Sequence, residues 1–149
     1  ALSRRLLMNF SDIDVIIESK LEMNIQEIFE KKGEPFFRQI EEKITLEELK
    51  KENIIISLGG GAIMNSKIKK SILLNSVSFW LDLDIKTLEK RLKKSKKRPL
   101  LNEKNLGNSL KQIYKERKNT YAAANYKINC SKLNINLTTD RIIKLYANN

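Results

Sequence analysis

The most constraining feature of the sequence is a largely apolar run, Ile54 to Leu58, which is interrupted only by Ser57 and is followed directly by three consecutive glycines. A strand without alternating polar residues is buried on both faces, and such burial is typical of a parallel sheet. A second segment, Val77 to Leu83, is also largely apolar, with Ser78 and Asp82 as its polar residues. Segments with helical spacing of apolar residues lie before, between and after the two runs. The sequence therefore predicts an α/β fold in which helices flank a parallel sheet.

The expected elements alternate along the whole chain without an internal repeat or a long linker, which predicts one domain over residues 1–149. Asn24, with Glu27 three residues later, is typical of a capping box at a helix start. Asp84 is a candidate N-cap, and Thr138 or Thr139 is expected to cap the last helix. We expect helices over residues 1–8, 13–21, 24–31, 35–50, 64–74, 85–94, 110–121 and 138–147, and strands over 9–12, 54–58, 77–83 and 127–130.

Composition excludes several classes of function. The chain has no histidine and one cysteine, Cys130, which excludes Ser-His or Cys-His nucleophiles and argues against a structural zinc site. No segment approaches the roughly 20 apolar residues that span a bilayer. The net charge of +11 comes mostly from lysines on helices, and aromatic residues do not interleave with them, so we expect no specific nucleic-acid binding. We expect a cytoplasmic monomer.

Two motifs in the first third of the chain carry charged side chains. Asp12 and Asp14 lie where a short strand meets a helix, so one carboxylate can face a metal-bound phosphate while the other reaches a hydroxyl. The alternative for this pair is a helix N-cap. Arg38 follows two phenylalanines, which favours a preorganised guanidinium that binds a carboxylate or a phosphate. The alternative for Arg38 is a helix-surface ion pair with Glu41 or Glu42.

Three further motifs follow. Gly59, Gly60 and Gly61 let a ligand approach the backbone closely and offer N–H donors, although a plain turn is the alternative. The basic stretch 86–98 ends in Arg98-Pro99-Leu100-Leu101 and is typical of a lid over a triphosphate, although a basic run is usually a solvated face. Arg117 lies near a helix end, where the alternative is an interaction with the helix dipole.

Together the motifs resemble the shikimate kinase family in order and spacing. They read Phe-x-Asp-x-Asp, Gly-Glu-x-x-Phe-Arg-x-x-Glu, Gly-Gly-Gly, Arg-Pro-Leu-Leu and Arg-x-x-x-Tyr, and they cover nearly the whole chain. The resemblance implies a three-layer P-loop kinase-like fold, with a substrate-binding region at about 13–45 and a lid at about 93–108. It also implies transfer of the γ-phosphoryl group of ATP to the 3-hydroxyl of shikimate, with Mg²⁺, on the route to chorismate and the aromatic amino acids.

The resemblance assigns roles by motif position. Asp14 resembles the residue that holds the shikimate hydroxyls and assists deprotonation, and Asp12 the carboxylate that faces magnesium through water. Arg38 and Arg117 resemble the pair that binds the shikimate carboxylate. The substrate-binding residues are completed by the loop Gly59–Gly61, of which Gly60 resembles the backbone contact. The lid arginine that reaches the ATP phosphates corresponds to Arg98, and the arginine packed on adenine corresponds to Arg91.

The sequence departs from the family at its start, because residues 1–8 match the helix that follows the family's Gly-x-x-Gly-x-Gly-Lys-Ser loop. We therefore expect the first strand and the P-loop to be absent, and the chain as given to be a fragment that binds ATP poorly and has little activity. One alternative is a loop-less pseudokinase that binds a small acid or a partner protein. Another is a related small-molecule P-loop kinase, such as a gluconate kinase.

Overall fold

A computed structural model of the protein describes residues 1–93 and 105–148. The chain divides into two compact units, Ala1–Val77 (unit 1) and Ser78–Asn149 (unit 2), and each is described by itself. Whether the two units form the single domain expected over residues 1–149 depends on how they assemble, so the single domain stays a prediction.

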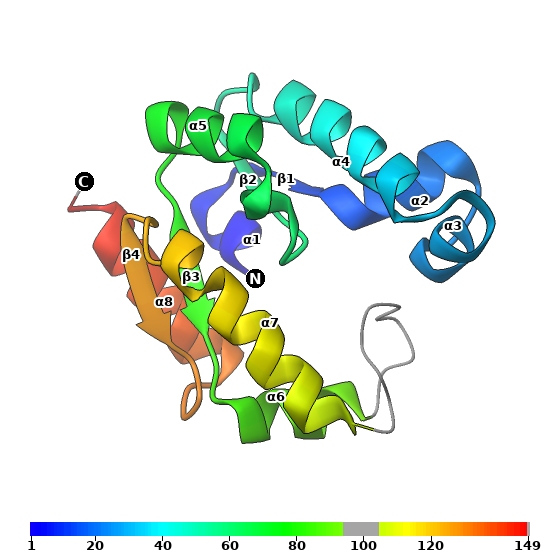
Figure 1. Cartoon of the computed structure of the whole chain (residues 1–149). Coiled ribbons are helices and arrows are strands. Elements are labelled where there is room, and N and C mark those ends of the chain that lie inside the picture. The colour runs from blue at the N-terminus through cyan, green and yellow to red at the C-terminus, as the bar shows by residue number, and fades with distance from the viewer. Residues whose placement is uncertain (94–104, 149) are drawn as a thin grey trace. The chain divides into compact units, whose positions relative to one another are not determined.

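Unit 1 contains a pair of parallel strands, β1 (Asn9–Asp12) and β2 (Ile54–Ser57), with Asn9 opposite Ile54 and Asp12 opposite Ser57. Because the pair is parallel, both strands end at the same edge, where β1 runs into a helix and β2 runs into the glycines (Figure 1). The helices of unit 1 are α1 (Leu2–Leu6), α2 (Ile13–Leu21), α3 (Ile25–Lys32), α4 (Glu34–Glu48), the 3₁₀ helix η1 (Ala62–Met64) and α5 (Ser66–Asn75).

The main core of unit 1 lies where α2 and α3 pack against α4. Figure 1 shows these three helices gathered at one end of the unit. The Phe29 and Phe37 rings are in contact there, with centroids 4.8 Å apart. The buried core side chains are Ile13, Ile17, Ile28, Phe37 and Ile44, and a second cluster of Ala62, Ile68 and Ile72 lies beside it. This packing fixes α4, which carries Arg38, against α2, the helix that directly follows β1.

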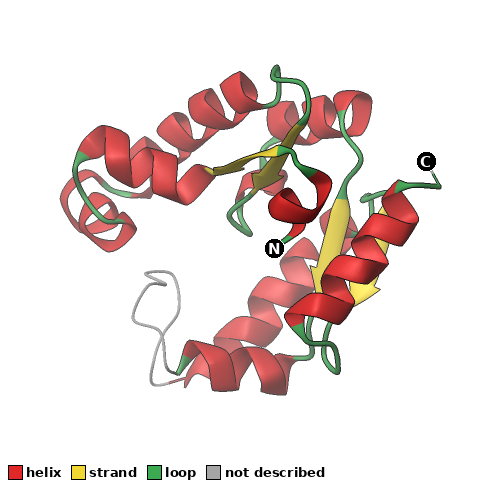
Figure 2. Cartoon of the chain, turned by 180° about the vertical axis from the view of Figure 1, so that it is seen from behind, coloured by secondary structure: helices red, strands yellow, loops and turns green. Residues whose placement is uncertain are grey.

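Unit 2 contains a second parallel pair, β3 (Phe79–Asp82) and β4 (Tyr126–Asn129), in which Trp80 lies opposite Lys127. Figure 2 shows the two strands side by side with helices around them. The Lys127 ammonium lies 4.2 Å from the Trp80 ring centroid and 3.0 Å from an Asp82 oxygen. The helices of unit 2 are α6 (Ile85–Leu92), α7 (Leu106–Tyr121) and α8 (Ile135–Tyr146).

Helix starts follow the expected caps with one exception. The capping box of Asn24 and Glu27 is present, and Asp84 caps α6. The expectation that Thr138 or Thr139 caps the last helix is wrong, because the cap of α8 is Asn134, whose side chain accepts a hydrogen bond from the Leu137 amide. The two threonines lie inside the helix, where their hydroxyls donate to the carbonyls of residues 134 and 135.

The apolar strands form parallel pairs as expected, but their expected burial on both faces is wrong. All four residues of β2 are only half-buried, and Leu81 of β3 is 51% exposed. Each pair contains two strands, so within the described residues each strand has a neighbour along one edge only. The apolar runs therefore predicted the parallel pairing of the strands correctly, but they did not predict how far each strand is buried.

A polar contact joins α4 to β1 inside unit 1. Glu48 is buried, and its carboxylate accepts hydrogen bonds from the Lys51 ammonium at 2.6 Å and the Ser11 hydroxyl at 2.7 Å. The hydrogen bond from Lys51 has the largest effect on the pKa of Glu48, and with that from Ser11 it outweighs burial, so the pKa lies below its usual value.

This contact predicts a pH-dependent contribution to stability. A carboxyl group whose pKa is lowered by folding stabilises the protein above its unfolded pKa, about 4.3, and this contribution is lost as the pH falls through the folded pKa. We expect Glu48→Gln to lower the free energy of urea unfolding at pH 7, and the difference from the unsubstituted chain to shrink below about pH 4. The control is Glu47→Gln, on the exposed neighbour. A difference that stays constant between pH 7 and pH 3 would contradict this origin.

Candidate functional site

The edge where β1 and β2 end places the candidate residues of unit 1 close together. Asp12 is the last residue of β1 and pairs in register with Ser57, the last residue of β2. Asp14 lies in the first turn of α2, and the loop Gly59–Gly61 begins two residues after Ser57. In α/β folds, ligands bind outside the carboxyl ends of parallel strands. The positions of these residues fit that rule.

Asp12 is the N-cap of α2. Its Oδ1 accepts hydrogen bonds from the backbone amides of Asp14 at 3.1 Å and Val15 at 3.3 Å. The capping alternative from the sequence is thus confirmed for Asp12. Both hydrogen bonds use Oδ1, so Oδ2 takes no part in capping, and the metal-facing role that the resemblance implies for Asp12 stays a prediction.

Arg38 is held by carboxylates of its own helix. Its Nη1 donates to Glu41 Oε2 at 2.7 Å, while Nε and Nη2 lie 3.3 and 3.2 Å from Glu34 Oε1. These spacings of three and four residues bring side chains together on one helix face. The ion pair with Glu41, which the sequence offered as an alternative, is confirmed, and it fixes the direction in which the guanidinium points.

The environment of Arg38 is partly buried. The guanidinium carbon lies 5.2 Å from the Phe37 ring centroid, and the Arg38 side chain is 30% exposed, against 3% for Glu41. Burial disfavours the charged guanidinium, but the hydrogen bond and charge of Glu41, followed by those of Glu34, raise the pKa of Arg38 above its usual value. Arg38 therefore presents a permanent positive charge in a fixed direction.

The loop Gly59–Gly61 lies against these side chains. A methyl group at Gly59 would be 3.2 Å from Asp14 Oδ1 and 3.3 Å from Glu41 Oε1. A methyl group at Gly61 would be 2.6 Å from both terminal nitrogens of Arg38. The loop is thus the place where the carboxylates and the guanidinium approach one another. Glu41 has no functional role among the sequence predictions, although its position three residues after Arg38 indicates that it can orient the guanidinium.

The remaining candidate residues belong to unit 2 or lie outside the described residues. Arg117 is half-buried in α7, and Arg91 is exposed in the last turn of α6. Arg98 lies outside the described residues, as do residues 94–104 of the expected lid. Of the lid expected at about 93–108, the structure describes residue 93 and residues 105–108, with α7 beginning at Leu106, and the extent of the lid stays a prediction.

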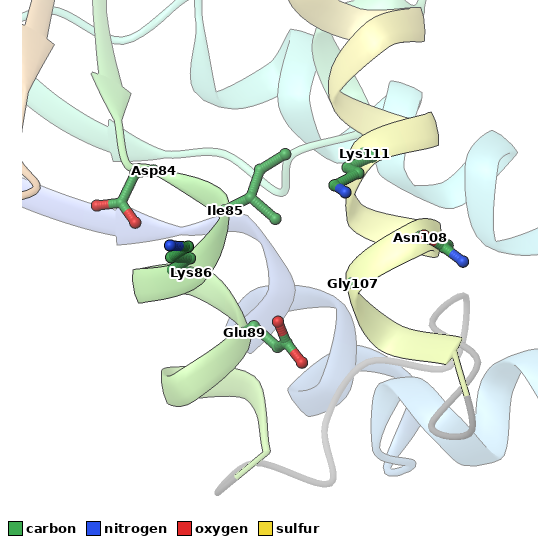
Figure 3. A pocket seen from close by; sticks show the side chains of 7 residues that line it. All are labelled: Asp84, Ile85, Lys86, Glu89, Gly107, Asn108 and Lys111. Carbon is green, nitrogen blue, oxygen red and sulfur yellow. The ribbon is translucent and has the colours of Figure 1, made fainter.

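A pocket of about 440 Å³ lies between α6 and α7 in unit 2. Figure 3 shows the Glu89 side chain between the two helices, with Lys111 on α7. The pKa of Asp84, at the start of α6, is lowered to about 2, first by hydrogen bonds from the side chain and backbone of Thr87. The pocket is lined by Asp84, Ile85, Lys86, Glu89, Gly107, Asn108 and Lys111, so Arg91 is not part of it.

The described residues contain neither a cluster of metal-binding side chains nor a membrane-spanning helix. Across residues 1–93 and 105–148, no group of three or more Cys, Asp or Glu side chains is arranged to hold a metal ion. In the same ranges, no helix has the length and apolar character needed to cross a bilayer.

Comparisons with known proteins point to one family. The family model described as shikimate kinase matches residues 1–146. Shikimate kinase from Sulfurihydrogenibium sp. is 40% identical over 131 residues, which are 88% of this chain and 78% of that protein. The enzyme from Bartonella henselae is 35% identical over 93% of this chain and 66% of its own length. The structure of shikimate kinase from Acinetobacter baumannii in complex with shikimate matches with a TM-score of 0.94 and 28% identity, covering 99% of this chain and 83% of that one.

The hydrogen bonds that Asp12 accepts as the N-cap of α2 predict how its substitution affects stability. Asn caps helices about as well as Asp does, whereas Ala does not. We expect Asp12→Ala to lower the free energy of unfolding by about 1 kcal/mol and Asp12→Asn to leave it nearly unchanged. Urea unfolding of the two variants, followed by circular dichroism, measures both effects. Equal destabilisation by Ala and Asn would contradict the capping role.

Proposed function

The chain belongs to the shikimate kinase family, and on this premise we propose that the edge formed by β1, β2 and the loop Gly59–Gly61 binds shikimate for phosphorylation. By family the protein is an ATP:shikimate phosphotransferase. The observation that carries the proposal is the joint approach of Asp14 and Arg38 to the glycine loop, with buried Glu41 holding Arg38 in place.

Recognition of the substrate's carboxylate is assigned to Arg38 and Arg117. Guanidinium groups bind carboxylates through paired, charge-assisted hydrogen bonds, which fix the orientation of the acid as well as its charge. Arg38 is preorganised by Glu41, so little of its side-chain freedom remains to be lost on binding. Arg117 supplies the second guanidinium, a role supported by its place in the Arg-x-x-x-Tyr motif. The backbone of Gly60 adds a polar contact to the substrate.

Asp14 is assigned to the reacting hydroxyl. Its carboxylate accepts a hydrogen bond from the 3-hydroxyl and takes the proton as that oxygen attacks the γ-phosphorus. The new bond joins the 3-oxygen to phosphorus, and the bond from phosphorus to the bridging oxygen of ADP breaks. Phosphoryl transfer depends on positioning and on neutralising charge more than on covalent chemistry. The absence of histidine from the sequence is therefore no obstacle to phosphoryl transfer.

The nucleotide side of the reaction is assigned to ATP with Mg²⁺. Mg²⁺ is usually held by one or two carboxylates together with waters and phosphate oxygens, so the single carboxylate of Asp12, with Oδ2 outside its capping bonds, fits such a site. When bound, the ion neutralises the phosphate oxygens. Arg91 is assigned to the adenine and Arg98 to the ATP phosphates. We place the reaction in a cytoplasmic monomer, in keeping with the buried free thiol of Cys130.

Binding of shikimate tests the proposed site directly, without relying on turnover. Arg38→Lys keeps a positive charge beside Glu41 but removes the planar fork. We expect the dissociation constant for shikimate, measured by calorimetry, to rise by about 10- to 100-fold, as for the loss of one charged hydrogen bond.

Arg4→Lys is the matched control, because Arg4 is exposed on α1 and the substitution has the same chemistry. It should leave shikimate binding unchanged. Gluconate should bind much more weakly than shikimate. The proposal would be contradicted if shikimate did not bind, if gluconate bound more tightly, or if the two Arg→Lys variants behaved alike.

A further inference from the structure

Gly61 is in closer contact with Arg38 than any side chain could be. A methyl group on Gly61 would lie 2.6 Å from Nη1 and Nη2 of Arg38 and 2.9 Å from its central carbon. Ordinary contact to a methyl group begins at about 3.4 Å. The guanidinium thus occupies the space that a side chain at position 61 would need.

The backbone itself does not require glycine at this position. Gly61 has φ −90° and ψ −19°, a conformation open to any residue, and it directly precedes η1. Gly33, in contrast, has φ +84°, where an L-residue with a side chain is strained. Glycine is therefore required at position 61 by the space that Arg38 occupies, and not by the backbone conformation.

We propose that Gly61 is a positioning residue for substrate binding, whose bare Cα forms a slot that receives the Arg38 guanidinium. The slot and Glu41 constrain the guanidinium from two sides: Glu41 binds Nη1 at 2.7 Å, and Gly61 borders both terminal nitrogens. This inference rests on the proposed function, because it assigns to Arg38 the binding of the substrate carboxylate. It also assigns different roles to two glycines of the loop: Gly60 offers backbone contacts to the substrate, whereas Gly61 acts through Arg38.

The contacted atoms determine what a substitution does. They are the end of a flexible side chain, so the guanidinium can move by the required distance, about 0.8 Å, without a shift of the backbone. A movement of this size lets Arg38 keep an ion pair with Glu41, so the fold is retained. A displacement of about 1 Å in a positioned group can nevertheless cost about 100-fold in function. Gly61→Ala should therefore affect binding far more than stability.

The test uses Gly61→Ala in the full chain, with Gly107→Ala as the matched control. A methyl group at Gly107, inside α7, would lie 3.4 Å from the nearest Glu89 oxygen, which is an ordinary contact. We expect Gly61→Ala to raise the dissociation constant for shikimate by about 10- to 100-fold, with little change in the urea midpoint. Gly107→Ala should leave binding unchanged. Unchanged shikimate binding by Gly61→Ala would overturn the inference.

A double substitution shows whether Gly61 acts through Arg38. In an Arg38→Lys background the planar group that fills the slot is absent, so adding Gly61→Ala should weaken shikimate binding by less than about twofold. An equal loss in both backgrounds would mean that position 61 contacts the substrate itself, which overturns the inference. If Gly61→Ala alone fails to fold, the double variant should fold, and its failure would also count against the slot.

A measurement without ligand separates this inference from the proposed function. In the ligand-free protein, the ¹⁵N resonance of Arg38 Nε should shift in Gly61→Ala and stay unchanged in Gly107→Ala. If shikimate does not bind the unsubstituted chain but the resonance shifts, the proposed function fails and the slot stands. An unshifted resonance in Gly61→Ala would overturn the slot whatever the chain binds.

Discussion

The ion pair between Arg38 and Glu41 is the interaction on which the rest of the site depends. Glu41 is almost completely buried, and a buried carboxylate that loses its partner costs about 3–5 kcal/mol. The pair therefore constrains the helix that carries it, the phenylalanines beside it and the loop that it touches. Helix α4 places both residues on one face, the core of α2, α3 and α4 fixes that helix, and the glycines let the charged groups approach the end of β2.

Local sequence patterns predicted helix boundaries well where a few neighbouring residues determine them. The capping box at Asn24 and the helix Ile13–Leu21 match the expected boundaries, because capping and apolar spacing act within a few residues. The start of the last helix was missed, since Asn134 competes with the threonines and a hydroxyl can donate to the helix backbone instead. Strand burial depends on neighbouring strands, which the apolar run of β2 does not encode.

The site was predicted as a set of residues but not as a geometry. For Asp12 and Arg38 the sequence offered a structural role and a functional role as alternatives, yet the contacts of a helix cap and an ion pair are compatible with binding. The slot at Gly61 is encoded by no local pattern, because it depends on a guanidinium 23 positions earlier in the chain. Sequence spacing therefore suggested which residues form the site, whereas the direction of each side chain depends on tertiary packing.

The most direct measurement of the central claim is a crystal structure of the protein with shikimate bound. The account predicts that the shikimate carboxylate accepts hydrogen bonds from both Arg38 and Arg117, with the ring hydroxyls beside Asp14 and the Arg38 guanidinium still against Gly61. Shikimate bound elsewhere, or an Arg38 guanidinium that has left Gly61 and Glu41 to reach it, would contradict the account.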